Sequence, residues 1–182
     1  YRSNKKGPTG PCGRIATTSG MTNLHHGQRK LFVAELRCLT LLLASATDRA
    51  HVVYAGAAPG YHIPFLVELF PGVVWHLYDP APFHIKATPR ARLYNEYFTD
   101  GVARGWAGRA DVFICDIRVA AGPREAIWSQ EFEDQVARDM AAQKGWVRIM
   151  APRAGAMLKF RPPYTAADQP AEISYLRGRI LW

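Results

Sequence analysis

A glycine turn that joins an apolar strand to an apolar helix constrains the fold of this chain more than any other feature. The apolar run at residues 51–55 leads directly into Gly56, Ala57, Ala58, Pro59 and Gly60. An apolar helical pattern follows, formed by Phe65, Leu66, Leu69 and Phe70. A strand that ends in a glycine turn and opens into a helix lets a ligand lie against bare backbone at the helix N-terminus. The turn therefore predicts a ligand site in an α/β fold.

The next predicted strand, residues 73–79, ends in Asp79, about 20 residues after Gly56. An acid at the tip of the second strand is how nucleotide-binding α/β sheets hold ribose hydroxyls. Gly56 and Gly60 do not form the Gly-x-Gly-x-x-Gly of a dinucleotide site. The spacing therefore favours a single adenosine-type cofactor such as S-adenosylmethionine over NAD. The alternative is that both glycines serve only an ordinary strand-to-helix turn.

Strands and helices alternate along the rest of the chain. This order predicts an α/β, Rossmann-like fold, in which helices cover both faces of an open, mostly parallel sheet. We expect helices at residues 27–46 and 129–151, strands at 51–55, 73–79, 92–98, 111–116, 156–161 and 172–182, and a proline-punctuated loop at 80–90. Residues 1–22 are expected to form a basic flexible arm, and residues 23–182 one domain that is incomplete at its C-terminal end.

The composition is that of a soluble globular protein, with 48% apolar and 21% charged residues in a chain of 182. The net charge of +8 favours a polyanionic partner such as nucleic acid. The longest apolar stretch, residues 39–46, is too short to span a bilayer, so no membrane association is expected.

The three cysteines lack the Cys-x-x-Cys spacing of a metal or redox site. Cys38 falls in a helical apolar pattern and Cys115 inside a predicted strand, so both are expected in the core. Cys12 precedes them in the basic arm. This usage fits a reducing compartment, and we expect a cytoplasmic protein with no disulfide framework and no metal.

Four ionisable residues stand where such a sheet concentrates function: Lys30, Asp116, Lys159 and Glu172. Asp116 ends a strand, and open α/β sheets bind ligands at the carboxyl ends of their strands. A lysine on an apolar strand, such as Lys159, costs desolvation free energy unless acids pair with it. A second cation and burial lower the pKa of a lysine amine. A Lys30–Lys159 pair flanked by both acids could therefore deprotonate a ribose hydroxyl, whose oxygen would attack the methyl group of S-adenosylmethionine.

Taken singly, each of these residues also has an ordinary explanation. Lys30 would be a solvated helix lysine, Lys159 an edge-strand charge and Glu172 a loop acid. Their occurrence as a set beside the glycine turn favours the chemical interpretation.

Five segments together resemble the poxvirus cap-specific mRNA 2′-O-methyltransferases, which double as the poly(A) polymerase small subunit. They are HGQRKLFVAEL at 26–36, VYAGAAPGYH at 53–62, WHLYD at 75–79, ICDIR at 114–118 and LKFRPPY at 158–164. The resemblance implies a class I, FtsJ-like methyltransferase fold that binds S-adenosylmethionine. It also implies methyl transfer to the ribose 2′-oxygen of the first transcribed nucleotide of capped mRNA, in a viral protein.

The resemblance assigns roles to residues of this chain. The catalytic tetrad would be Lys30, Asp116, Lys159 and Glu172. The cofactor pocket would be lined by Gln28, Tyr54, Gly56, Ala58, Gly60, His62, Asp79, Thr99, Asp116 and Ile117. Tyr164 would stack on the cap guanine, and Arg118 and Arg161 would contact the RNA substrate. The implied partners are capped mRNA and a poly(A) polymerase catalytic subunit or other viral transcription proteins.

Two alternatives remain open from the sequence. The same tetrad serves FtsJ-type enzymes that methylate ribosomal or transfer RNA, and cap dependence of the activity would separate them. The other alternative is a non-catalytic RNA-binding subunit that confers processivity on a poly(A) polymerase. The basic arm and the net charge of +8 favour it, whereas Lys30, Asp116 and Lys159 together argue for an active methyltransferase.

Overall fold

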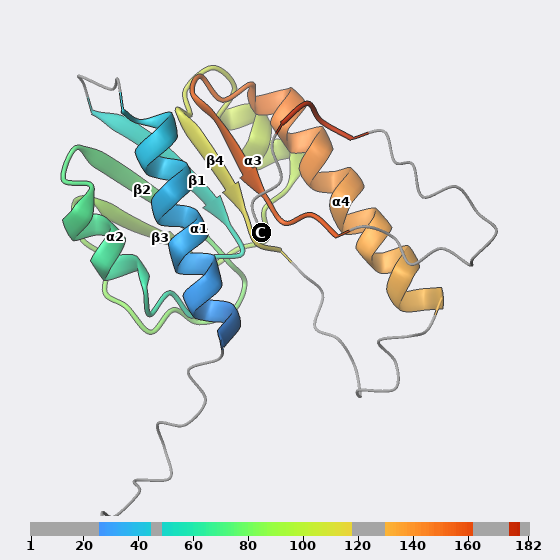
Figure 1. Ribbon diagram of the computed structural model, residues 1–182, viewed down its shortest axis with the longest axis horizontal. Coiled ribbons are helices and arrows are strands. Elements are labelled where there is room, and N and C mark those ends of the chain that lie inside the picture. The colour runs from blue at the N-terminus through green and yellow to red at the C-terminus, as the bar shows by residue number, and fades with distance from the viewer. Residues whose placement is uncertain (1–25, 45–48, 118–129, 162–174, 179–182) are drawn as a thin grey trace, which may run out of the picture.

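A five-stranded, all-parallel sheet with helices on both faces forms the body of the protein (Figure 1). The computed structural model describes residues 26–44, 49–117, 130–161 and 175–178. The strand order β3-β2-β1-β4-β5 places β1 at the centre of the sheet. This order is Rossmann-like, as the alternation of elements in the sequence predicted. The predicted fold class is confirmed.

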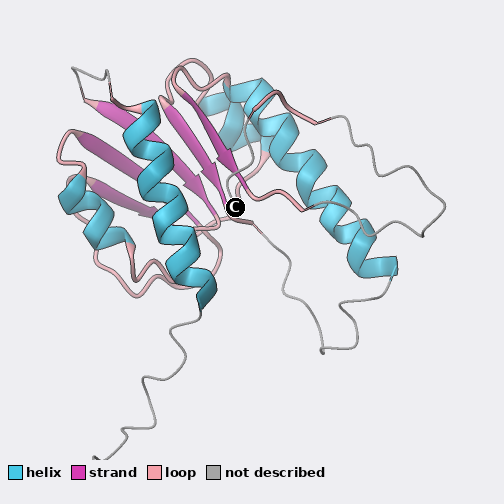
Figure 2. Ribbon diagram, viewed as in Figure 1, coloured by secondary structure: helices cyan, strands magenta, loops and turns pink. Residues whose placement is uncertain are grey.

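The described helices and strands mostly alternate along the chain. Their bounds are α1 His26–Leu42, β1 Ala50–Ala55, α2 Ile63–Leu69, β2 Val73–Tyr78, β3 Ala91–Tyr94, α3 Asp100–Gly105, β4 Val112–Cys115, α4 Gln130–Met150 and β5 Gly155–Leu158. Figure 2 shows the helices as separate layers in front of and behind the strands. Because β1 and β2 are parallel, α2 must run back against the strand direction to connect them.

Each face of the sheet carries its own apolar core, which explains why the strands are apolar on both sides. Along β1, Val52 and Tyr54 face one core, whereas Val53 and Ala55 face the other. The first core is closed by α1 and α2, through Leu39, Ile63 and Leu66. The second core is closed by α3 and α4, through Ala103, Trp146 and Met150, and by Trp106, which follows α3.

The carboxyl ends of the three middle strands lie level with one another. Ala55 of β1 pairs with Tyr78 of β2 on one side and with Cys115 of β4 on the other. The ladder continues one residue further, because Asp116 N donates to the Ala55 carbonyl at 3.0 Å. The residues that follow these strands therefore gather at one edge of the sheet.

Several predicted elements differ from those in the structure. The strand expected at 92–98 ends at Tyr94, since Phe98 turns into the core between Tyr78, Phe113 and Trp146. The strand expected at 156–161 ends at Leu158, so Lys159 lies just past the sheet rather than on it. The helix α3 was not expected, although Thr99 gives an N-cap signal.

Most of the last predicted strand, residues 172–182, and all of the predicted arm lie outside the described residues. Of residues 172–182 the structure describes 175–178, and these four are not in a strand. The arm at 1–22 and the Cys12 thiol lie outside the described residues. Within the described part of the chain, no helix is long and apolar enough to cross a membrane.

The apolar residues of α2 divide between two faces of the helix. Leu66 is buried together with Ile63, but Phe65 and Leu69 point away from the sheet and are exposed. The reason is geometric, since residues four apart lie on one helical face, and Ile63, Leu66 and Phe70 already occupy the inner face. Cys38 and Cys115 are buried free thiols, which confirms their assignment to the core.

Candidate functional site at the carboxyl edge of the sheet

The candidate site lies where β1 and β4 end, at the point where the strand order reverses. After β1 the chain crosses to β2 on one side of the sheet, and β4 lies on the other side. In open α/β sheets, the crevice at this switch point is where ligands bind. The backbone segments that bound it here are the turn beginning at Gly56 and the segment at Asp116 and Ile117.

Gly56 is required by the packing of these two segments. A Cβ atom at this position would lie 2.8 Å from Ile117 N and 2.9 Å from the Asp116 carbonyl carbon. Its φ of +82° also falls where side chains are strained. The second glycine of the turn, Gly60, has a φ of +79°. The backbone conformation and packing of the turn therefore explain the glycines without any ligand. The close approach of Gly56 to Ile117 also leaves backbone exposed where β1 and β4 end.

Asp79 ties the tip of β2 to the glycine turn. Its Oδ2 accepts a hydrogen bond from Ala58 N at 3.0 Å, and its Oδ1 accepts one from Ala81 N at 2.8 Å. A carboxylate has about four lone-pair positions, so both oxygens can accept further donors. The acid expected from the sequence thus stands beside the turn, half-buried, with acceptor capacity left for hydroxyl groups.

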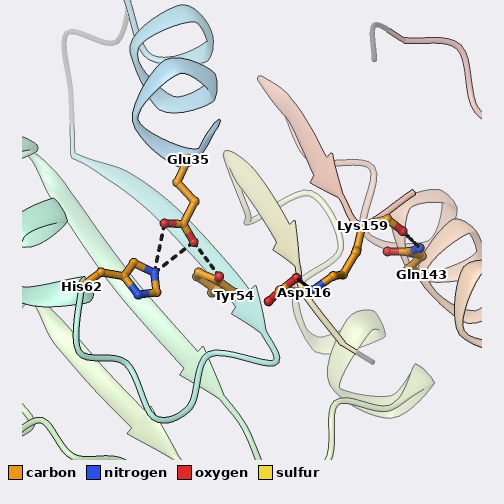
Figure 3. A network of polar contacts seen from close by, with 6 residues as sticks. All are labelled: Glu35, Tyr54, His62, Asp116, Gln143 and Lys159. Carbon is orange, nitrogen blue, oxygen red and sulfur yellow. Dashed lines mark hydrogen bonds and ion pairs between the residues drawn. The ribbon is translucent and has the colours of Figure 1, made fainter. Parts of the chain in front are cut away.

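Asp116 and Lys159 form an ion pair at the opposite side of the turn (Figure 3). The two residues follow the neighbouring strands β4 and β5, so the pair joins the ends of both strands. The pair is only partly buried, since 31% of the lysine side chain and 16% of the aspartate side chain are exposed. Gln143 of α4 holds the Lys159 carbonyl through its Nε2 at 2.6 Å. This fixes the backbone that carries the amine.

A small pocket opens beside this ion pair. It is lined by Ile117, Val136, Asp139, Met140, Gln143, Lys159 and Arg161. Two strand ends and α4 therefore contribute to one hollow in which the Lys159 side chain is accessible. With a volume of about 10 Å³ the hollow has room for roughly one water molecule, so it opens the Lys159 side chain to solvent but does not enclose a ligand.

A second polar centre, which we did not predict, surrounds Glu35 of α1 (Figure 3). Glu35 is 0% exposed, and it accepts a hydrogen bond from the Tyr54 hydroxyl at 2.5 Å. His62 Nε2 lies 3.1 Å from one carboxylate oxygen and 3.0 Å from the other. Because a carboxylate only accepts, this imidazole nitrogen must carry the proton. Glu35 thereby joins α1 to β1 and to the residue that precedes α2.

The buried glutamate had a signal in the sequence. Glu35 lies four residues after Leu31 and four before Leu39, on the apolar face predicted for that helix. An acid on a buried helical face needs donors, and Tyr54 and His62 supply them here. Burial, followed by the charge of Glu35, raises the pKa of Tyr54 well above its usual value. The tyrosine is therefore a stable neutral donor.

The cysteines near the edge are poor nucleophiles. Burial raises the pKa of the Cys115 thiol to about 12. Burial, with a contribution from Glu35, raises that of Cys38 to about 11. Both thiols remain protonated at neutral pH. Among the residues that the structure describes, no group of three or more His, Cys, Asp or Glu side chains could hold a metal ion.

The remaining predicted site residues are distributed as follows. Lys30 is exposed on α1. The Thr99 hydroxyl caps α3 by accepting from Val102 N. Arg161 forms an ion pair with Glu133 of α4, and its guanidinium lies 5.0 Å from the centre of the Phe132 ring.

Four further predicted residues cannot be placed. Arg118, Tyr164 and Glu172 lie outside the described residues, as does the side chain of Gln28. The complete tetrad and the cap contact of Tyr164 therefore stay predictions. The cofactor contact of Tyr54 stays a prediction too, and its hydroxyl is already engaged by Glu35.

Comparison with known proteins identifies a family. The family model described as "Poly A polymerase regulatory subunit" matches residues 17–171, which is most of the chain. The match includes every described element from α1 to β5. None of the curated protein sequences compared with the chain matches it significantly.

Proposed function

The chain belongs to the poly(A) polymerase regulatory subunit family, and from this premise we propose that it is an RNA-binding regulatory subunit of a poly(A) polymerase. The observation that carries the proposal is the family match over residues 17–171. The match favours the regulatory alternative over cap methylation, which the sequence pattern had put first. A regulatory subunit implies a catalytic subunit as its partner.

The charge of the chain supports a role on RNA. The net charge is +8, and basic side chains such as Lys30, Arg92 and Arg148 are exposed. Arginine and lysine side chains that neutralise phosphates release counterions, so such binding weakens as salt rises. A subunit that keeps a growing RNA near a polymerase must bind the RNA backbone independently of its sequence.

Salt-dependent RNA binding is the first test of this proposal. We expect the purified chain to bind a short single-stranded RNA, with an affinity that falls by about tenfold or more between 50 and 200 mM salt. Fluorescence anisotropy of a labelled oligonucleotide measures this directly. An affinity that does not change with salt would contradict an RNA-binding role.

We also propose a second function, methyl transfer from S-adenosylmethionine to a ribose 2′-oxygen of RNA. The specific observation that favours it is the Asp116–Lys159 pair beside the glycine turn. The two functions are compatible, because the family that the chain resembles combines them. Capped mRNA is the proposed substrate of this activity.

The residues present at the turn fit an adenosine-type cofactor. Asp79 retains acceptor capacity for ribose hydroxyls next to Ala58. The approach of Gly56 to Ile117 leaves backbone rather than side chains at the β1 and β4 ends. When bound, S-adenosylmethionine would supply an electrophilic methyl group.

In this proposal the Lys159 amine takes the proton of the attacking ribose hydroxyl. The amine must be neutral when it does so, and the partly open position of Lys159 lets it exchange protons with solvent. Asp116 holds the amine in place, and Gln143 holds the backbone behind it. Positioning of this kind contributes much of the rate of a methyl transfer.

Labelled methyl transfer tests this second function. Two short RNAs that differ only in a methylated guanosine cap are offered with labelled S-adenosylmethionine, and nuclease digestion locates the label. We expect Lys159→Ala to abolish transfer while the Kd for S-adenosylmethionine stays within about threefold, because the amine acts on the acceptor. Asp79→Ala should instead weaken cofactor binding. Turnover in Lys159→Ala would contradict the mechanism.

A further inference from the structure

We propose that the catalytic subunit of the poly(A) polymerase docks on an apolar patch formed by α1 and α2. This inference rests on the proposed regulatory function and adds the surface that carries it. The α1–α2 patch consists of Phe32, Val33 and Leu36 of α1 with Phe65 and Leu69 of α2. Both helices cover the first core (Figure 1), and Phe32 also packs against that core.

Three large apolar side chains of the patch are turned toward solvent. Val33 is 61% exposed, Phe65 60% and Leu69 55%. Single exposed apolar residues are normal, but a contiguous group of them on a surface marks an interaction site. Phe32 and Leu36 are half-buried and contribute the floor between the two helices.

The two helices bring these residues together. The Phe32 and Phe65 rings are 6.4 Å apart in an edge-to-face arrangement. Since both helices run against the strand direction, Leu36 and Leu69 follow one turn later on each of them. The contact between Phe32 and Phe65 therefore connects the apolar residues of the two helices.

The fold does not need these exposed side chains. The inner face of α2 is closed by Ile63 and Leu66, both fully buried, and the inner face of α1 by Leu39. Phe65 and Leu69 form a second apolar stripe on the same short helix. Their exposure is unfavourable in the isolated chain, and burial by a partner would remove this cost.

Charge at the rim indicates the chemistry of the partner. Arg29 and Arg37 are exposed on α1, four residues before and four after Val33, and therefore flank it along the helix. Aromatic residues with arginine are enriched in the buried parts of protein–protein interfaces. The complementary surface is an apolar protein surface with acidic residues around it.

RNA is the less suitable occupant of this surface. Phe65 could stack on a base, but the aliphatic Val33, Leu36 and Leu69 offer nothing to phosphates or base edges. Exposed aliphatic side chains beside arginine are instead typical of a protein-binding face. The patch thus fits the subunit that the family description implies.

Charge-introducing variants test the docking surface. Phe65→Asp and Leu69→Asp place a carboxylate in the patch, and Leu41→Asp places one on α1 across the helix from Phe32, as a matched control. Leu41 is as exposed as Phe65. The full chain and the poly(A) polymerase catalytic subunit of the same organism are mixed, and Kd is measured by sedimentation velocity. Urea unfolding of each variant verifies that the fold is retained.

We expect the wild-type chain and Leu41→Asp to bind alike, and Phe65→Asp and Leu69→Asp to bind at least about tenfold more weakly. If the wild type binds and both patch variants bind equally well, the docking surface is wrong while the regulatory function stands. If the wild type does not bind the catalytic subunit at all, the regulatory function fails, and the proposed occupant with it. A wild-type dimer that Phe65→Asp dissociates, or a patch variant that loses only RNA binding, would also overturn the assignment.

Discussion

Two carboxylates near the same sheet edge are held in contrasting ways. Glu35 is completely buried, accepts a hydrogen bond from the Tyr54 hydroxyl and contacts the His62 imidazole. Asp116 is paired with a single cation, Lys159, and both side chains remain partly accessible (Figure 3). A fully buried carboxylate that is held by internal donors is out of reach of solvent, so we expect its main effect to be on stability. An accessible ion pair can exchange its partner for a ligand. The contrast divides the edge into a structural half around Glu35 and a half around Asp116 and Lys159, which we call the reactive half because the proposed chemistry lies there.

The largest effect should come from the structural half. Glu35→Ala removes the acceptor of both Tyr54 and His62 and leaves a cavity, so we expect the free energy of unfolding to fall by about 4 kcal/mol. Urea unfolding followed by circular dichroism measures this loss. Glu68→Ala is the control, because Glu68 is exposed on α2. Equal losses in the two variants would show that the Glu35 network contributes nothing.

A histidine buried on the other face of the sheet, His76, should make the stability of the fold depend on pH. Burial lowers the pKa of His76 to about 4, with smaller contributions from His51, Arg92 and Arg109. Its Nε2 lies 3.1 Å from His51 Nδ1, and its Nδ1 lies 3.2 Å from the Tyr94 hydroxyl.

Because the folded pKa of His76 is below the unfolded value of 6.5, the unfolded chain binds more protons between these two pH values. The contribution of His76 to the free energy of unfolding is therefore fully present above pH 6.5. It is lost as the pH drops toward 4, and the total loss is on the order of 3 kcal/mol. Urea unfolding at several pH values should show a shallower slope in His76→Phe. The same slope in both proteins would contradict the assignment.

A side chain placed in the glycine turn should lower the stability of the fold. We expect Gly56→Ala to cost about 2 kcal/mol, because the new Cβ would meet Ile117 N and the φ of +82° strains any side chain. Gly145→Ala in α4 is the matched control, since nothing lies within 4 Å of its Cβ position. That substitution should stabilise the helix by about 0.5–1 kcal/mol. If both substitutions changed the free energy of unfolding in the same direction, the turn would not be strained.

The reactive half should contribute the smallest change in stability. Lys159→Ala removes a partly exposed ion pair, so we expect the free energy of unfolding to change by less than about 1 kcal/mol. The same variant should lose methyl transfer completely. A loss of stability comparable to that of Glu35→Ala would place Lys159 among the structural residues instead.

The sequence predicted those site residues that directly follow a strand. Asp79 and Asp116 were found because each directly follows an apolar strand, and parallel strands bring such residues to one edge. Glu35 was missed because its helix was interpreted by its apolar residues alone. The Lys30–Lys159 pair depends on how α1 lies against β5, and no local pattern determines the distance between two side chains so far apart in sequence.

Tail-length measurement tests the regulatory function most directly. The poly(A) polymerase catalytic subunit of the same organism is given a short oligo(A) primer and ATP, with and without the purified chain, and the product lengths are resolved on a gel. We expect the chain to convert short products into long tails at a constant enzyme concentration, because a regulatory subunit keeps the RNA bound through successive additions. Identical product lengths with and without the chain, at saturating concentrations, would contradict the proposed regulatory function.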